Sequence, residues 1–496
     1  MARFFTDIAC SVRRPVLSLI AAAVLALPLL AQPALARGPE SIADVAEKVI
    51  DAVVNISTSQ SAPNRATPTP RLPPGSQFEE FFEEFFKNRR GPGDNQPPNR
   101  TPRRVNSLGS GFIIDPTGIV VTNNHVIAEA DEITVILNNG SRLKAEVIGR
   151  DQKTDLAVLS VKSPTPLPFV KFADSDKVRL GEWVIAIGNP FSLGGSVTAG
   201  IVSARNRDIN SGPYDNYIQT DASINRGNSG GPLFNLEGEV IGVNTAIISP
   251  SGGSIGIGFA VPSKTVMAVI DQLRQFKEVR RGWLGVKIQQ VTDEIAESLG
   301  IKPTRGALVA GVDDKGPAKP AGIEAGDVII SFDGKPIKEM RDLPRIVADT
   351  PVGKDVEVVV IRKGAEAKKT VRLGRLDDPE KPQPASAPAT GPTDKPVVQK
   401  ALGLGLSSLS EELRKQYKIK DSVRGVVITE VDASSVAADK RLAPGSVIVA
   451  IEQEQVKEPA DVQSRVDALK KAGKKTALLL VATAEGDMLF VALPIN

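Results

Sequence analysis

Short β-branched runs separated by turn residues fill the chain from Gly109 to about Pro262. Such runs alternate with Gly, Asn, Asp and Pro and lack long helices between them; examples lie at residues 111–114, 119–122, 133–137, 183–187 and 240–243. This spacing is typical of a β-sandwich or β-barrel. One helix is expected at residues 263–277, with Ser263 as its N-cap and an apolar face made of Val266, Val269, Ile270 and Leu273.

The last 200 residues, roughly, repeat one pattern twice. Residues 305–309 recur as 424–428, and residues 326–330 recur as 445–449, both at an offset of 119 residues. The segment Leu284-Gly285-Val286 is matched to Leu404-Gly405-Leu406, at an offset of 120 residues. We therefore expect two copies of a module of about 95 residues, joined by a proline-rich extended linker at residues 377–399.

The N-terminus has the features of an export signal. Arginines precede an apolar run from Pro15 to Leu30, and Ala34-Leu35-Ala36 supplies small residues at the cleavage positions. A membrane anchor is the weaker interpretation, because the run is short and Pro28 interrupts it. We expect cleavage after Ala36 and export to a compartment that allows disulfides.

Composition narrows the function classes. A chain of 496 residues with 41% hydrophobic and 24% charged residues is typical of a soluble protein of several domains. A net charge of +3 gives no argument for binding nucleic acid. The only cysteine, Cys10, lies in the signal, so the mature chain has no disulfide, and a single histidine leaves no expected metal site or cofactor.

Residues 59–105 form a Pro-, Asn-, Arg- and Gly-rich insertion that contains a stripe of phenylalanines. At helical spacing these side chains share one face opposite glutamates; they are Phe78, Phe81, Phe82, Phe85 and Phe86. The stripe either packs within its own chain or docks onto a neighbouring subunit.

One histidine, one acid and one serine occur in an informative order. His125 is the only histidine, Asp155 opens an apolar run, and Ser229 lies among glycines. The order His, Asp, Ser is that of double-barrel serine hydrolases. The α/β-hydrolase alternative requires a histidine after the serine, and none exists there. We therefore expect Ser229 to be the nucleophile, His125 the base and Asp155 its orienting acid, although other acids lie upstream of the serine.

The residues around Ser229 suggest how a substrate is held. The turn Gly227-Asn228-Ser229 is expected to form the oxyanion hole, with the N–H groups of Gly227 and Ser229 as donors. Ser223 stands where an acid in trypsin-like sites selects Lys or Arg. We therefore expect small aliphatic side chains at the cleaved position, with pocket and substrate-pairing residues Ile224, Thr245, Ala246, Ile247 and Ile248.

The repeated module carries a glycine-flanked apolar tetrad, Trp283-Leu284-Gly285-Val286, which is similar to the carboxylate-binding loop of PDZ domains. In the second copy, Gly403-Leu404-Gly405-Leu406 is the expected counterpart, with Ser446 in place of Asp327. A purely structural spacer is the alternative for either copy.

Together the blocks around His125, Asp155 and Ser229 resemble those of the HtrA/DegP (Do-like) family of periplasmic serine endoproteases. This resemblance implies a mainly β chain, in which a trypsin-like double β-barrel precedes two PDZ domains of α+β, partly open barrel type. It also implies ATP-independent degradation of misfolded exported proteins, a homotrimer with larger assemblies, capture of apolar C-termini, and a loop around Arg207 that senses PDZ occupancy. An exported holdase with secondary proteolysis is the alternative function.

The expected domain boundaries follow from these features. They are a signal peptide at 1–36, a protease domain at 37–278, PDZ domains at 279–376 and 400–496, and the linker at 377–399 between them.

Overall fold

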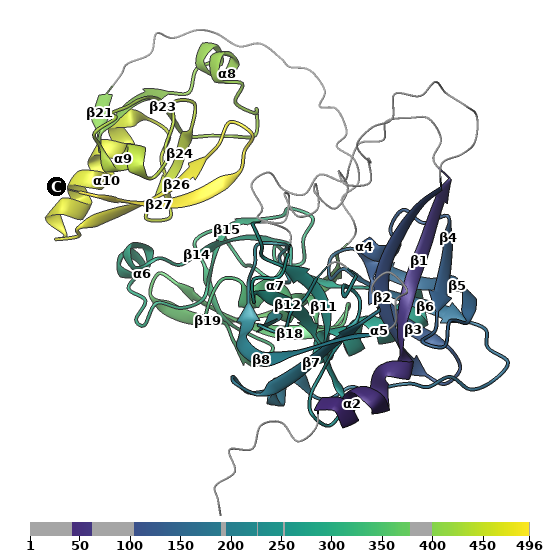
Figure 1. The fold of residues 1–496 in the computed structure, drawn as a ribbon. Coiled ribbons are helices and arrows are strands. Elements are labelled where there is room, and N and C mark those ends of the chain that lie inside the picture. The colour runs from purple at the N-terminus through teal and green to yellow at the C-terminus, as the bar shows by residue number, and fades with distance from the viewer. Residues whose placement is uncertain are drawn as a thin grey trace, which may run out of the picture.

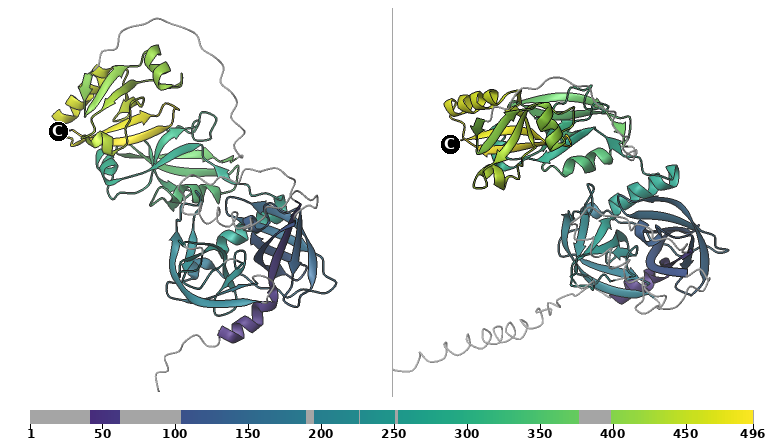
Figure 2. Two further views of the ribbon diagram at one scale, coloured as in Figure 1. Left: turned by 45° about the horizontal axis from the view of Figure 1, so that its top comes forward. Right: turned by 90° about the horizontal axis from the view of Figure 1, so that it is seen from above.

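The computed structural model describes residues 42–61, 104–189, 195–225, 227–250, 253–376 and 399–495. Two six-stranded β-barrels come first along the chain, and a six-stranded and a seven-stranded sheet follow, with a two-stranded sheet beside the first of them (Figure 1). Figure 2 shows the barrels at one end of the molecule and the two C-terminal sheets at the other. The expected signal peptide and the phenylalanine stripe lie outside the described residues.

The first barrel closes with the strand order β1-β2-β3-β6-β5-β4. Its elements are β1 (Val53–Ser61), β2 (Arg104–Asp115), β3 (Ile119–Asn123), α4 (Asn124–Ile127), β4 (Glu132–Ile136), β5 (Arg142–Asp151) and β6 (Leu156–Val161). The β-branched runs at 111–114, 119–122 and 133–137 fall on β2, β3 and β4, as predicted. Their inward side chains, including Ile56, Val120 and Leu159, form the core of this barrel.

The second barrel closes with the order β10-β11-β12-β9-β8-β7. Its elements are η3 (Ser175–Lys177), β7 (Trp183–Gly188), β8 (Ser196–Arg207), β9 (Tyr217–Thr220), β10 (Pro232–Phe234), β11 (Val240–Ile247) and β12 (Gly258–Pro262). The predicted strands at 183–187 and 240–243 are confirmed as β7 and β11. Ile224 lies in the core of this barrel and is 1% exposed.

A third apolar cluster lies between the two barrels and joins them. It contains Phe112 and Val121 of the first barrel with Ile185 and Phe259 of the second. Two helices pack on this cluster and complete it: α2 (Ile42–Val49), which continues into η2 (Ile50–Ala52), and α5 (Ser263–Phe276). One core thus spans both barrels and packs them against each other.

The helix at 263–277 is confirmed, but its predicted N-cap is wrong. Val266, Val269, Ile270 and Leu273 are buried, as its periodicity predicts. Ser263 is the first helical residue and caps no helix N–H group. Its hydroxyl instead donates to the Ala173 carbonyl at 2.6 Å and accepts from the Ser175 N–H at 3.2 Å. The serine therefore ties α5 to the loop before η3.

Two similar modules follow the barrels. The first module has the sheet β14-β15-β16-β18-β19, and the second has β21-β22-β23-β24-β26-β27. Elements of the first are β13 (Gly282–Trp283), β14 (Val286–Gln290), α6 (Asp293–Leu299), β15 (Ala307–Val312), β16 (Val328–Phe332), β17 (Lys335–Pro336), α7 (Asp342–Ala348), β18 (Asp355–Arg362), β19 (Ala365–Arg372) and β20 (Gly374–Arg375). Elements of the second are β21 (Gln399–Ala401), β22 (Leu404–Ser408), α8 (Glu411–Tyr417), β23 (Val426–Val431), α9 (Val436–Asp439), β24 (Val447–Ile451), β25 (Glu454–Gln455), α10 (Pro459–Lys471), β26 (Thr476–Ala482) and β27 (Met488–Pro494).

Strand register corrects one part of the predicted repeat. Val286 pairs with Val312 in the first module, and Leu404 pairs with Val431 in the second. Since Val312 and Val431 are related by the offset of 119, Leu404 is the structural counterpart of Val286. The loop of the second module is therefore Ala401-Leu402-Gly403-Leu404, whereas the predicted Gly403–Leu406 segment lies largely within β22. Leu-Gly-Leu occurs at residues 402–404 and again at 404–406, and the prediction aligned the second occurrence with the loop of the first module.

The loss of Asp327 from the second copy has a structural counterpart. In the first module Asp327 is 1% exposed and accepts two bonds from Arg362, at 2.6 and 2.7 Å. In the second module, Ser446 and Val481 stand at the two positions related by 119 residues. The acid and its partner are thus absent together, so no unpaired charge is buried.

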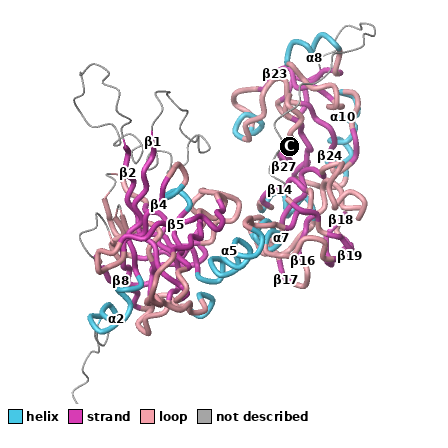
Figure 3. Tube along the Cα trace, turned by 90° about the vertical axis from the view of Figure 1, so that its right-hand side faces the viewer, coloured by secondary structure: helices cyan, strands magenta, loops and turns pink. Residues whose placement is uncertain are grey.

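The two modules pack face to face through their sheets. Their shared cluster includes Leu308 and Ile330 of the first module with Leu480 and Phe490 of the second. Gln289 adds a two-way backbone contact, because its side-chain amide donates to the Phe490 carbonyl and accepts from the Phe490 N–H, both at 2.8 Å. The tandem is therefore one packed unit, and Figure 3 shows α5 on the side of the barrels that faces it.

None of the helices within the described ranges has the length and apolar character needed to cross a membrane.

We expect Phe490→Ala to destabilise the tandem by about 3–5 kcal/mol, the usual result of emptying a buried phenylalanine site. Phe490 is 2% exposed, whereas the neighbouring Leu489 is 44% exposed. Leu489→Ala is the matched control and should change stability by only about 0.5 kcal/mol. Calorimetric unfolding of the full chain measures both, and equal losses for the two variants would contradict a sheet-on-sheet interface.

Candidate active site

His125 and Asp155 contact each other through both the side chain and the backbone of the histidine. His125 lies on α4 directly after β3, and Asp155 lies just before β6. The Nδ1 atom of His125 is 2.5 Å from Oδ2 of Asp155, and the His125 N–H donates to Oδ1 at 2.8 Å. Their side chains are only 10% and 19% exposed. The carboxylate therefore holds both the ring and the backbone of the histidine.

The backbone at Asp155 is itself unusual. Its φ of 55° is left-handed, a conformation that aspartate tolerates better than most residues but that still costs about 1 kcal/mol or more. The Asp155 carbonyl accepts from the Asn124 N–H at 3.0 Å and from Asn123 Nδ2 at 2.7 Å. These bonds from the histidine's own turn hold the strained residue in place.

Ser229 begins the second half of the site, on the turn before β10. Gly230 follows it with a φ of 84°, and a Cβ there would lie 2.3 Å from the Ser110 carbonyl and 3.0 Å from the Asn123 nitrogen. Only glycine therefore allows the serine's turn to lie against β2 and the end of β3. This contact brings Ser229, from the second barrel, to the strand end that carries His125.

Ser110 fixes this turn and was not identified from the sequence. Its N–H donates to the Ser229 carbonyl at 2.9 Å, and its hydroxyl donates to the Gly227 carbonyl at 2.5 Å. The same hydroxyl accepts from the Asn189 N–H at 2.8 Å. The only signal in the sequence was the run of small residues Gly109-Ser110-Gly111, which indicates close packing but no role.

The backbone N–H groups of the Ser229 turn are of two kinds, those bonded to a backbone carbonyl and those that are not. The N–H groups of Asn228, Gly230 and Gly231 donate to backbone carbonyls at 2.8–3.0 Å. Within the described residues, the N–H groups of Gly227 and Ser229 have no such acceptor. These two groups are thus available for a ligand, while the N–H of Asn228 is already bonded to the Asn225 carbonyl.

The predicted substrate residues lie in different settings. Thr245, Ala246 and Ile247 end β11 beyond the part that β10 covers, so one side of the strand carries no further strand there among the described residues. Thr245 also contacts the site, since its hydroxyl accepts from Asn123 Nδ2 at 3.1 Å. Ile248 follows β11 and is partly exposed. Ile224 is wholly buried, so its predicted contact with substrate stays a prediction.

The predicted peptide loop and the predicted sensing residue lie outside the barrel cleft. Trp283, Leu284, Gly285 and Val286 run from the end of β13 into β14, an edge strand whose one partner among the described strands is β15. Arg207 ends β8, and its side chain donates to Gln219 at 2.9 Å. It lines a cavity of about 550 Å³ together with Arg341, which precedes α7 of the first module.

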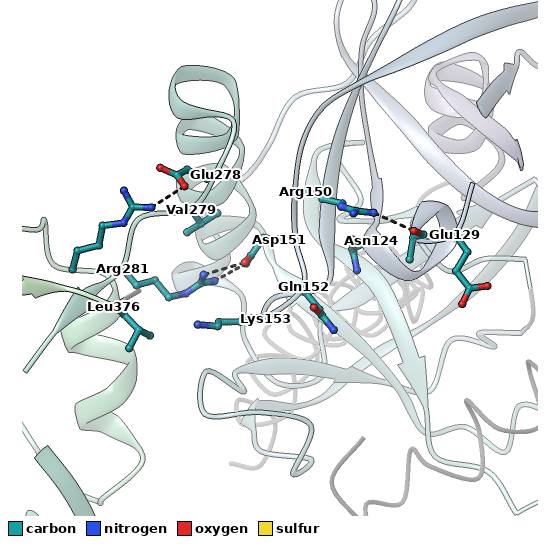
Figure 4. A pocket seen from close by; sticks show the side chains of 12 residues that line it. Asn124, Glu129, Arg150, Asp151, Gln152, Lys153, Glu278, Val279, Arg281 and Leu376 are labelled. Atoms are coloured by element: carbon teal, nitrogen blue, oxygen red, sulfur yellow. Dashed lines mark hydrogen bonds and ion pairs between the residues drawn. The ribbon is translucent and has the colours of Figure 1, made fainter. Parts of the chain in front are cut away.

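A buried ion pair links the first module to the turn of Asp155. Arg281 donates to both carboxylate oxygens of Asp151, at 3.0 and 2.5 Å, as Figure 4 shows. The Asp151 carboxylate also accepts from the Thr154 N–H at 3.1 Å and from its hydroxyl at 2.5 Å. Thr154 directly precedes Asp155, so a continuous set of bonds runs from the module to the proposed acid.

Electrostatics favours the charged form of this pair. Burial alone raises the pKa of Asp151, but the hydrogen bonds and charge of Arg281, with the bonds from Thr154, hold the pKa below its usual value. Within the described ranges, no three acidic, histidine or cysteine side chains gather as metal ligands do. The absence of a metal stays a prediction.

Comparison with known proteins gives two family matches and close relatives. Residues 109–243 match the trypsin-like peptidase domain family, and residues 282–373 match the PDZ domain family. A probable periplasmic serine endoprotease, DegP-like, of Brucella suis biovar 1 (strain 1330) is 43% identical over 92% of this chain and 89% of its own length. The protein of the same name from Rhizobium meliloti (strain 1021) is 45% identical over 86% and 84%.

A solved structure matches the barrels and the first module. The HtrA-type protease AlgW with decapeptide is 40% identical, with a TM-score of 0.56, and the match covers 68% of this chain and all of that one.

Replacing Ser110 by alanine should lower kcat with little change in KM. The Gly227 carbonyl loses its hydroxyl donor, so the turn is held less well. The decrease in kcat should be smaller than the decrease of about 10²–10³-fold that removal of an oxyanion donor causes. Ser141→Ala, an exposed serine of the same barrel, is the control. Cleavage of a chromogenic peptide gives kcat and KM for both variants. An unchanged kcat for Ser110→Ala would mean that the turn keeps its conformation without Ser110.

Asp151→Asn should destabilise the chain by about 3–5 kcal/mol, because it leaves Arg281 buried without its charge partner. Glu132→Gln breaks only an exposed pair with Lys144 and should cost less than about 1 kcal/mol.

The same pair predicts a pH dependence. Since the pKa of Asp151 is lowered on folding, its stabilisation is present above about pH 3.9, the usual value for aspartate. It is lost as the pH falls through the lowered pKa. Denaturant unfolding at a series of pH values should show a shallower acid limb for Asp151→Asn, and parallel curves would contradict the assignment.

Proposed function

Because the chain belongs to the DegP-like family of periplasmic serine endoproteases, we propose that His125, Asp155 and Ser229 form its catalytic triad. The protein is a serine endopeptidase of the periplasm with a trypsin-like domain and PDZ domains. The single observation that carries the triad is the His125–Asp155 contact at 2.5 Å, with the turn of Ser229 packed against the same strand end.

Each member has a distinct role in the proposed reaction. Ser229 Oγ attacks the peptide carbonyl while His125 takes its proton and later returns it to the leaving amine. Asp155 holds Nδ1 of His125 and stabilises the ring when it is charged. The N–H groups of Gly227 and Ser229 donate to the oxygen that becomes negative, and each such donor is worth about 3 kcal/mol of barrier.

The substrate is proposed to extend along β11. The uncovered side of Thr245–Ile247 offers backbone groups to an extended chain, next to the turn of Ser229. No acid stands at Ser223, and the predicted pocket residues Ile224, Ala246, Ile247 and Ile248 are aliphatic, which favours small aliphatic residues at the cleaved position. Misfolded exported proteins expose such segments and are the proposed substrates.

The first module is proposed to capture peptide ends. Among the described strands, one edge of β14 has no partner, and Val286 and Ile288 on it are only partly buried, as is Ile346 of α7, which packs on the same core. The loop that ends in Gly285, at a φ of 76°, can present N–H groups to a terminal carboxylate. The relative AlgW was solved with a decapeptide, and an apolar C-terminus fits the aliphatic groove here.

Two further features of the family are proposed for this chain. Arg207 lies at the cavity that it shares with Arg341, so a shift of α7 on peptide binding reaches the loop after β8. A homotrimer and larger assemblies are the proposed oligomers.

Ser229→Ala and His125→Ala should each abolish cleavage of unfolded casein, and the double variant should be no worse, since the members act as a unit. Asp155→Asn should lower kcat by about 10⁴-fold. Ser141→Ala is the matched control and should cleave normally.

Persistent cleavage by purified Ser229→Ala would refute the triad. The holdase alternative makes a different prediction: Ser229→Ala would suppress aggregation of unfolded casein as well as the unchanged chain, which itself would cleave little. The relatives are named as proteases, which favours cleavage as the main activity.

A further inference from the structure

The peptide-binding edge of the second module differs from that of the first, although the two loops correspond closely. Gly285 and Gly403 have φ angles of 76° and 75°. The Gly285 carbonyl accepts from the Asp313 N–H and the Gly403 carbonyl from the Asp432 N–H, both at 2.9 Å. The acceptor glycines are thus equivalent, and so are the strands β14 and β22 that follow them.

The strand before each loop has a different partner in the two modules. In the first module β13 pairs with β20, with Gly282 opposite Arg375 and Trp283 opposite Gly374. This pairing leads β13 away from β14. In the second module β21 pairs with β22 itself, with Lys400 opposite Gly405. The edge that is open on β14 is therefore occupied on β22.

The backbone of the loop explains this choice. In the second module Leu402 and Gly403 are both left-handed, at φ angles of 56° and 75°. Two consecutive left-handed residues form the tight turn that joins neighbouring antiparallel strands. In the first module only Gly285 of the corresponding pair is left-handed, because Leu284 has a negative φ. The loop between β13 and β14 therefore does not form a hairpin, and β13 does not pair with β14.

β21 has the direction of a captured peptide. A peptide that ends at the loop and lies along β22 must run antiparallel to it, because β22 begins at that loop. β21 runs antiparallel to β22 and ends at Ala401, where the loop starts. It also contacts α10, the helix that stands where α7 flanks the groove of the first module.

Burial of the strand side chains agrees with an occupied groove. Leu404 and Leu406 are 1% and 0% exposed, whereas their counterparts Val286 and Ile288 remain partly exposed. Ala401 and Leu402 pack on the same core as Leu404 and Leu406. The apolar positions that face a ligand in the first module are therefore covered by the chain itself in the second.

We propose that β21 is an internal occupant of the second module's peptide-binding edge, so that this module admits a peptide end only when β21 is withdrawn. The ligand would be of the same class as for the first module, an extended C-terminus with apolar side chains. The inference rests on the proposed capture of peptide ends by the first module. It makes β22 a second, closed site on each chain.

The test uses the full-length Ser229→Ala chain and a decapeptide that ends in Leu-Val, with its C-terminal amide as the control ligand. Calorimetric titration should give one peptide per chain. Adding Gly285→Val should abolish binding, because a Cβ there lies 2.7 Å from the Gly316 Cα at a left-handed φ. Two peptides per chain, or binding that survives Gly285→Val, would overturn the proposal.

Release of β21 should then restore binding. Alternate residues of an antiparallel pair direct their N–H groups to the partner strand, so Gln399→Pro/Lys400→Pro removes the donor whichever of the two bonds β22. Added to Gly285→Val, this pair should restore one peptide per chain. Asp394→Pro/Lys395→Pro, placed before β21, should not. If amide exchange shows that β22 alone has lost protection and peptide binding is still not restored, the second site is refuted.

Amide exchange on the Ser229→Ala chain gives a test that needs no β21 variant. The β22 amides should be protected without peptide and unchanged by it, while β14 should become protected only when peptide is added. Slowing of both strands by peptide would overturn the proposal. Absence of any binding would instead refute capture by the first module, and the protection of β22 before peptide is added would still decide whether β21 covers it.

Discussion

The joint between the two barrels at Ser110 is the constraint on which the active site depends. Ser110 lies on β2, yet its N–H and hydroxyl bond the carbonyls of Ser229 and Gly227 from the second barrel. Thr122, on the strand that leads to His125, donates to the Ser110 carbonyl at 2.7 Å. Neither barrel contains all three residues of the proposed triad, so the proposed chemistry requires that these few bonds hold the two barrels in one register.

The common core makes such a joint possible. Phe112 and Val121 of the first barrel share a cluster with Ile185 and Phe259 of the second, and α5 covers it. Well-packed interiors transmit displacement rather than absorb it. The ion pair of Arg281 with Asp151 also fixes the first module to the first barrel. Placement of that module and placement of Asp155 are therefore physically connected, through Thr154.

Strand edges are what distinguishes the two C-terminal modules and their proposed binding. A strand edge exposes unpaired N–H and C=O groups, which another extended segment can pair. In the first module, β13 turns to β20 and leaves the edge of β14 open. In the second, β21 pairs with β22. Within the described residues, two modules of one fold thus differ at this edge because a single short strand takes a different partner.

Local signals in the sequence determined most of the fold and the choice of the proposed triad residues. Alternation of apolar residues located the barrel strands, and helical spacing located the buried face of α5. A single histidine, with an acid and a glycine-framed serine after it, selected His125, Asp155 and Ser229. These signals work because side-chain periodicity and chain order are properties of short segments.

Tertiary structure alone decided the contacts between distant segments. The sequence did not identify Ser110 or the pairing of Arg281 with Asp151. Serine, arginine and aspartate are common surface residues, and no periodicity in the sequence indicates which of them are buried or with what they pair. It misplaced Ser263 as a cap and aligned Gly405 with Gly285, because hydroxyl partners and strand register are set by residues far away in the chain. Whether the edge is open or filled depends on the partner that the preceding strand takes, which is the distant β20 for β13 and the adjacent β22 for β21, and so only the folded chain distinguishes β14 from β22.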